Sequence, residues 1–230
     1  MTAYSLEVPP PDHNPDRDRL RQIGESVRAR LAELPEVYKI PANDKAELWA
    51  VGKFFTPDEC TRLCTMIDAV AQPSRAYDAT YDSGYRTSYS GDIDPHDPFV
   101  KKLTRRIDDL LGIDPSFGES IQGQRYLAGQ QFQAHVDWFP GSNESWAAEL
   151  DRGGQRSITA MAYLNSVDEG GATQFPRLGF GVEPRPGTLL IWNNADLRGT
   201  PNPWTIHAGS PVAQGVKYVI TKWYRCGPWY

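Results

Sequence analysis

The sequence predicts a mainly β protein with flanking helices, whose core is a double-stranded β-helix, also called a jelly roll. Glycine and proline are frequent, with 20 and 19 residues in a chain of 230. From residue 120 onward, clusters of Gly, Pro, Asn and Asp separate short candidate strands, which is typical of a jelly roll built from two sheets. Eight such strands are expected, at residues 120–127, 131–137, 157–164, 172–175, 181–185, 188–192, 204–208 and 216–224.

The part of the chain that precedes these strands is mostly helical in pattern. Apolar residues recur at helical spacing over 17–34, and Pro35 ends that helix. Residues 48–55 are expected to form a short strand and a turn. Residues 74–97 are rich in Tyr, Ser, Asp and Gly, which predicts a loop or hairpin that could act as a mobile lid.

Two further helices have clear end signals. Thr56 is a good N-cap, and Glu59 completes a capping box at the start of a helix over 57–70. A helix over 98–111 begins with proline and ends at Gly112. We expect all three helices to brace one sheet from the outside.

The remaining segments favour a single domain. Residues 1–16 are rich in proline and aspartate and are expected to be a disordered tail. This leaves one domain over 17–230, with the jelly-roll core at about 120–225. Whether the helix over 17–34 belongs to the core or to an interface stays open.

Composition excludes several classes of partner. The net charge of −5 provides no general attraction for phosphate backbones, so nucleic acid is not expected as a partner. The N-terminus lacks the pattern of a signal peptide, and no apolar run reaches the length of a membrane span, so no membrane is expected. The odd count of cysteines does not suggest a disulfide scaffold, and Cys60 and Cys64 are expected to be core thiols. A reducing, cytoplasmic location fits these features.

The most informative residues are His135, Asp137 and His207, which are followed by Lys217. Residues at i and i+2 of an extended segment point to the same side, so His135 and Asp137 can reach one metal ion together. His207 would complete the two-histidine, one-carboxylate set of non-haem Fe(II) oxygenases, which leaves positions open for a co-substrate and dioxygen. Lys217 suggests an anion site one strand away.

At this level of detail the sequence resembles the prolyl 4-hydroxylase group of Fe(II)/2-oxoglutarate dioxygenases. The likeness covers about 105 residues in the family's order. It is carried by QRYLAGQQFQAHVDWF (124–139), RSITAMAYLNSVDEGGATQFP (156–176), VEPRPGTLLIWNN (182–194) and WTIHAGSPVAQGVKYVITKWYR (204–225).

The resemblance implies Fe(II) and 2-oxoglutarate as cofactors, with ascorbate as an optional reductant. It also implies that His135, Asp137 and His207 ligate the iron. The favoured activity is hydroxylation of a prolyl residue in a peptide or protein by dioxygen, with release of succinate and CO2.

Further roles carry over by resemblance. Lys217 would pair with the distal carboxylate of 2-oxoglutarate, Thr159 would donate a hydrogen bond to the same carboxylate, and Tyr126 would also bind 2-oxoglutarate. Trp223 matches an aromatic that lies near the substrate. Arg86 belongs to RTSYSGDID (86–94), which is similar to a substrate-covering loop of the family.

One residue departs from the family pattern, because Phe132 stands where the family usually has tyrosine. If the tyrosine hydroxyl orients the target proline, that contact is missing, and a free amino acid or small natural product is an alternative substrate. A non-catalytic metal-binding jelly roll, or a cupin-type isomerase or dioxygenase that does not use 2-oxoglutarate, would leave Lys217 and Thr159 unexplained.

Overall fold

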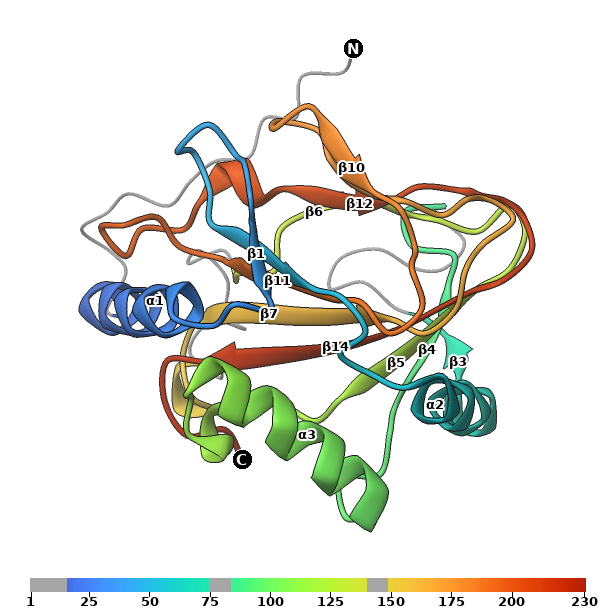
Figure 1. The fold of residues 1–230 in the computed structure, drawn as a ribbon, viewed down its shortest axis with the longest axis horizontal. Helices are drawn as coiled ribbons and strands as arrows, with labels where there is room; N and C mark the ends of the chain where they lie inside the picture. The colour runs from blue at the N-terminus through green and yellow to red at the C-terminus, as the bar shows by residue number, and fades with distance from the viewer. Residues whose placement is uncertain (1–15, 75–83, 140–148) are drawn as a thin grey trace.

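The computed structural model describes residues 16–74, 84–139 and 149–230. Three helices lie on one side of a large sheet, and a smaller sheet lies on its other side (Figure 1). The helices are α1 (Arg17–Ala32), α2 (Pro57–Val70) and α3 (Pro98–Leu111). The expected arrangement of helices outside one sheet is therefore confirmed.

The large sheet has eight strands, and its neighbouring strands pair in antiparallel fashion. In spatial order they are β1 (Val37–Ile40), β2 (Leu48–Val51), β11 (Leu189–Asn193), β7 (Arg156–Tyr163), β14 (Lys217–Arg225), β5 (Gln122–Tyr126), β4 (Tyr89–Asp92) and β3 (Gln72–Pro73).

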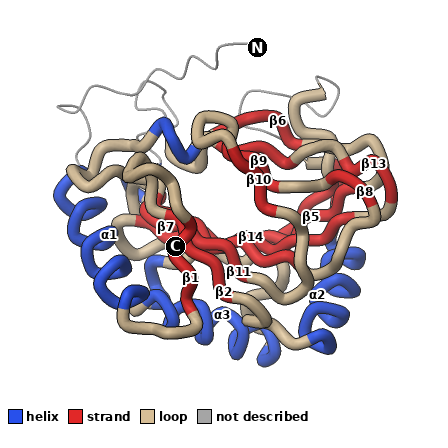
Figure 2. Tube along the Cα trace, turned by 45° about the horizontal axis from the view of Figure 1, so that its top comes forward, coloured by secondary structure: helices blue, strands red, loops and turns tan. Residues whose placement is uncertain are grey.

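The facing sheet is also antiparallel and has four strands. In spatial order they are β10 (Phe180–Val182), β9 (Thr173–Phe175), β12 (His207–Gly209) and β6 (Phe132–His135). A short pair, β13 (Val212–Gln214) with β8 (Glu169–Gly170), lies at one end, and Figure 2 shows the two main sheets opposite one another. Two facing antiparallel sheets confirm the predicted jelly roll.

The helix ends follow the local signals in the sequence. The Thr56 hydroxyl accepts a hydrogen bond from the Glu59 N–H at 3.2 Å, and the Glu59 carboxylate accepts one from the Thr56 N–H at 2.9 Å. Gly112 ends α3 in the left-handed conformation with φ of 66°, which costs glycine little. Both capping predictions are confirmed.

Two apolar cores support the site from either side of the large sheet. The outer core packs Leu63 of α2 and Leu103 of α3 against the large sheet. The inner core lies between the two sheets and includes Tyr163, Phe175 and Trp192, all fully buried. Burial of side chains of this size contributes roughly 1.5–3 kcal/mol each, so the walls around the inner space are stable.

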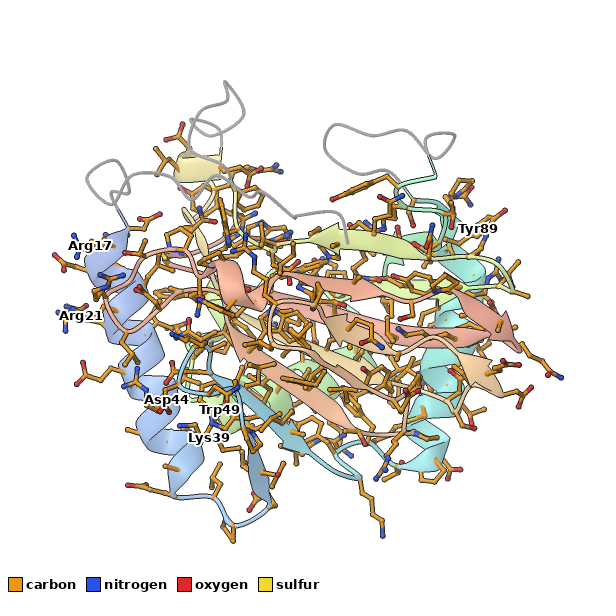
Figure 3. The ribbon with its side chains drawn as sticks, turned by 90° about the horizontal axis from the view of Figure 1, so that it is seen from above. Arg17, Arg21, Lys39, Asp44, Trp49 and Tyr89 are labelled. Carbon is orange, nitrogen blue, oxygen red and sulfur yellow. The ribbon has the colours of Figure 1, made fainter. Side chains whose placement is uncertain are left out.

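Helix α1 packs through one face, with Val27 and Leu31 in the outer core. Leu20, Val27 and Leu31 are buried, whereas Arg17 and Arg21 extend away from the sheets (Figure 3). This answers the question left open for the N-terminal helix.

A chain of hydrogen bonds ties the start of α1 to Gln155 and Phe139, which are distant in the sequence. The Asp16 carboxylate accepts a hydrogen bond from the Gln155 backbone N–H at 2.8 Å. The Gln155 side chain accepts from the Phe139 N–H at 2.7 Å and donates to the Phe139 carbonyl at 2.9 Å. Phe139 follows Asp137 by two residues, so α1 is linked to the segment that carries a candidate metal ligand.

Differences from the predicted elements are confined to short segments. Each predicted strand overlaps an observed one, but β1, β3, β8 and β13 were not predicted, because they are short and partly exposed. The loop or hairpin predicted at 74–97 contains β4, which pairs with β3. Residues 75–83, like the tail at 1–15, lie outside the described part of the chain. The strand expected at 204–208 begins only at His207, because Pro203–Thr205 form a 3₁₀ turn.

All three cysteines are free, with Cys60 and Cys226 buried and Cys64 half-buried. Burial raises the pKa of the Cys64 thiol to about 12, which makes it unreactive as a thiolate. Within residues 16–74, 84–139 and 149–230, we find no helix whose length and apolar character would let it cross a membrane.

Candidate metal and 2-oxoglutarate site

Strands β6 and β12 bring the three predicted metal ligands together. His135 ends β6, His207 begins β12, and the two residues are paired across the strands. Asp137 lies two residues beyond His135, and one ligand atom from each of the three residues falls within 4.8 Å of the others. The Asp137 carboxylate oxygens are 3.9 Å from His135 Nε2 and 3.7 Å from His207 Nε2. Figure 1 shows β6 and β12 beside each other above the large sheet.

Each histidine ring is held by its own chain. His135 Nδ1 lies 2.8 Å from the carbonyl of Gln133, and His207 Nδ1 lies 3.0 Å from the carbonyl of Thr205. A carbonyl can only accept, so Nδ1 carries the proton in both rings and Nε2 presents its lone pair toward Asp137. This is the arrangement that orients metal-binding histidines in proteins.

The electrostatics of the three groups suit a divalent cation. Burial lowers the pKa of His135 to about 3, so its ring is neutral. Burial would raise the pKa of Asp137, but His207, His135 and Arg156 outweigh it and the net shift is downward. Two imidazoles and one carboxylate are the donor set that non-haem Fe(II) oxygenases use, so the residues fit the metal.

The same cavity contains Lys217, the first residue of β14, which is paired with Tyr126 of β5. Its ammonium nitrogen lies 5.3 Å from the centre of the Tyr126 ring and 5.6 Å from that of Tyr163. Among the described residues no carboxylate comes within 4.0 Å of it, and burial lowers the pKa of Lys217 to about 7. The Glu183 carboxylate acts on this ammonium only from beyond that distance. A buried ammonium with no carboxylate at ion-pair distance fits the distal carboxylate of 2-oxoglutarate.

Thr173 is a candidate that sequence reasoning missed. It lines the cavity with Lys217, and its hydroxyl oxygen accepts a hydrogen bond from the Tyr163 hydroxyl at 2.7 Å. The Tyr163 hydroxyl also lies 3.0 Å from the Val182 carbonyl, which can take its single hydrogen. The place of Thr173 beside Lys217 makes its hydroxyl a candidate donor to a bound carboxylate. The signal was present, because Thr173 lies in the GGATQFP stretch that carries part of the family likeness.

Tyr126 lies in the cavity as expected, and its hydroxyl donates to the Gln124 side chain at 2.8 Å. Thr159 does not lie where it was predicted. It is paired with Trp223 of β14, six residues along that strand from Lys217, and its hydroxyl donates to the Asp137 carboxylate at 2.8 Å. The prediction that Thr159 binds 2-oxoglutarate is corrected: its partner is the candidate metal ligand.

The three residues predicted to face the substrate all line this cavity. Phe132 stacks on the His135 ring with centres 3.6 Å apart, and the Arg86 guanidinium lies 4.7 Å from the Phe132 ring centre. The Arg156 guanidinium lies over the Trp223 ring, 4.0 Å from its centre. Phe132 thus presents a ring face to a metal ligand where the family's tyrosine would add a hydroxyl.

A jelly roll that gathers two imidazoles and a carboxylate beside a buried lysine defines the class of non-haem Fe(II) oxygenases that use a 2-oxoacid. The chain belongs to the 2OG-Fe(II) oxygenase superfamily, whose pattern matches residues 121–225. Fe(II) and 2-oxoglutarate are accordingly its cofactors.

Two relatives found by sequence similarity are named as prolyl 4-hydroxylases. The chain is 31% identical over 199 residues to probable prolyl 4-hydroxylase 3 of Arabidopsis thaliana, a match that covers 76% of this chain and 67% of the relative. It is 37% identical over 140 residues to prolyl 4-hydroxylase subunit alpha-1 of Rattus norvegicus, covering 60% of this chain. The match spans only 26% of the length of that subunit.

Solved structures show the same fold. The viral collagen prolyl hydroxylase of Paramecium bursaria Chlorella virus-1, in complex with 2OG, superposes with a TM-score of 0.60 at 24% identity, over 77% of this chain and 94% of that one. A prolyl-4-hydroxylase of Pseudomonas putida gives a TM-score of 0.56 at 19% identity, over 80% and 96% of the two chains.

Proposed function

We propose that this protein is a 2-oxoglutarate-dependent dioxygenase that hydroxylates a prolyl residue in a peptide or protein. The observation that carries the proposal is one cavity with three side chains that can bind a metal at one place and, at another, a buried lysine with no carboxylate within 4.0 Å among the described residues. When bound, iron, 2-oxoglutarate and dioxygen supply the oxidation, which yields succinate, CO2 and a hydroxylated C–H bond.

The protein's own residues would bind and orient the reactants. His135, Asp137 and His207 would hold Fe(II), and Lys217 with Thr173 would bind the distal carboxylate of 2-oxoglutarate. The aromatic walls exclude water from this end of the cavity, which strengthens the pairing of lysine with carboxylate.

The substrate would approach from the side of Arg86, Phe132 and Trp223. A peptide is favoured because the relatives are prolyl 4-hydroxylases, and a prolyl hydroxylase of Trichoplax adhaerens with a similar fold is known in complex with a peptide fragment. The alternative substrate, a free amino acid or small natural product, is favoured by Phe132, which lacks the hydroxyl of the usual tyrosine.

The test is to incubate the Fe(II)-loaded protein with proline-containing peptides, and separately with free amino acids, in the presence of 2-oxoglutarate. We expect succinate to form in step with a peptide product heavier by 16 Da. Product from free amino acids alone would favour the alternative substrate. A protein that binds metal but never consumes 2-oxoglutarate would favour the cupin-type module.

We also propose a reducing compartment such as the cytoplasm, since all three cysteines are free thiols.

A further inference from the structure

The Asp137 carboxylate is held by a chain of two hydrogen bonds that runs across the large sheet. The Thr159 hydroxyl donates to Asp137 Oδ2 at 2.8 Å, and the Asn194 side-chain amide donates to the Thr159 hydroxyl oxygen at 2.9 Å. All three side chains are buried. Asn194 directly follows β11, which pairs with β7, the strand that carries Thr159.

The donor and the acceptor of each of these two hydrogen bonds are fixed. A hydroxyl has a single hydrogen, and the Asn194 N–H group at the Thr159 oxygen can only donate. The Thr159 hydrogen is therefore committed to Asp137. If the amide oxygen of Asn194 stood in this place, the Thr159 hydrogen would turn toward it, and Asp137 would face a hydroxyl lone pair.

The setting of Asn194 indicates that this donor matters. Its backbone N–H donates to the Ser157 carbonyl at 2.8 Å, and its carbonyl accepts from the Asn202 N–H at 2.9 Å, so its position is fixed. Its side-chain oxygen is buried and has no hydrogen-bond partner in the part of the chain that the structure describes. An unpaired buried acceptor costs about 1–3 kcal/mol, so this amide lowers the stability of the fold while it fixes the Thr159 hydroxyl.

We propose that Asn194 and Thr159 are positioning residues, which hold the Asp137 carboxylate in one rotation and keep one of its oxygens off the metal. This inference rests on the proposed role of Asp137 as a metal ligand. A carboxylate that rotates freely can bind a cation through both oxygens. Here that would occupy a position that the three-ligand arrangement leaves open for the co-substrate.

The test uses Co(II) in place of Fe(II), with 2-oxoglutarate titrated into the Co(II)-loaded protein and the visible absorption of Co(II) recorded. We expect Thr159→Val to keep Co(II) but to weaken 2-oxoglutarate binding about tenfold or more, the usual size of an effect on a residue behind a metal ligand. The absorption band should change as well. Thr159→Ser keeps the hydroxyl and should behave like the wild type.

A double-mutant cycle distinguishes an effect of the Asn194–Thr159 hydrogen bond from an effect of side-chain packing. Asn194→Leu should weaken 2-oxoglutarate binding in the wild-type background and have no further effect in the Thr159→Val background, since the chain is already broken there. Ser157→Ala is the matched control. It removes another buried hydroxyl of β7, which donates to the Tyr224 carbonyl at 3.0 Å, and should lower only the thermal stability.

Two results would overturn the inference: wild-type 2-oxoglutarate affinity in Thr159→Val, or effects of Thr159→Val and Asn194→Leu that simply add. The Asp137→Ala variant distinguishes failure of this inference from failure of the proposed function. Retained Co(II) affinity in Asp137→Ala would refute the ligand assignment itself, whereas lost affinity beside an unaffected Thr159→Val would refute only the positioning role.

Discussion

Replacing Lys217 by methionine should stabilise the protein without its ligand while destroying the binding of that ligand. Burial lowers the pKa of Lys217 from 10.5 to about 7, which corresponds to roughly 5 kcal/mol against the charged form, an upper bound for the gain. Methionine has a similar length and no charge, so Lys217→Met should unfold less readily than the wild type at pH 6.

The gain depends on pH in a defined direction. The folded-state pKa lies below the unfolded one, so between pH 7 and pH 10.5 the unfolded chain binds a proton that the folded chain does not. Wild-type stability therefore rises with pH across this window. The advantage of Lys217→Met should be largest and constant below pH 7, decline through the window, and vanish above pH 10.5.

The same substitution removes the cation that we propose to pair with 2-oxoglutarate. Removal of one partner of a buried ion pair costs about 3–5 kcal/mol, so we expect affinity for 2-oxoglutarate at pH 7 to fall at least ~100-fold while Co(II) binding is unchanged. Urea unfolding from pH 6 to pH 10, beside 2-oxoglutarate titration of the Co(II)-loaded protein, measures both effects. A variant less stable than the wild type at pH 6 would show that the ammonium has an internal counterion, and unchanged affinity would refute the co-substrate site.

Other perturbations test the rest of the site. His207→Ala should lose Co(II) and Fe(II) while circular dichroism stays native, and wild-type turnover in this variant would contradict the ligand set. Phe132→Leu removes the ring stacked on His135 and should weaken Co(II) binding about tenfold, whereas Phe132→Tyr should not; equal affinities would argue against the stack. Amide exchange over 80–92 should slow when a peptide substrate binds, and slow exchange in both states would rule out a lid there.

Local and chemical features of the site were accessible from the sequence. The metal ligands were identified because few residue types bind iron and because two positions of one strand point to the same side. Helix ends such as Thr56 with Glu59 depend on contacts within four residues, so the residue pattern alone specifies them.

Contacts that depend on how distant strands are paired were not accessible. Thr159 and Thr173 are both threonines in predicted strands, and from the sequence either could meet the carboxylate of 2-oxoglutarate. The choice is made by register: β7 lies between β11 and β14, and its pairing sets Thr159 opposite Trp223, far from Lys217 along the strand. Register is a property of the assembled sheet, and a slip of one residue would reverse every side chain.

The link from Asp16 through Gln155 to Phe139 makes the position of the candidate metal ligand Asp137 depend on the beginning of α1. A fragment limited to residues 121–225, the part that matches the superfamily, would lack this link. A fusion or truncation that removes Asp16 would leave the Gln155 backbone N–H without this acceptor. The segment next to Asp137, which Gln155 holds through Phe139, would then be less firmly fixed. Protein engineers who shorten this enzyme should therefore judge success by iron retention as well as by yield.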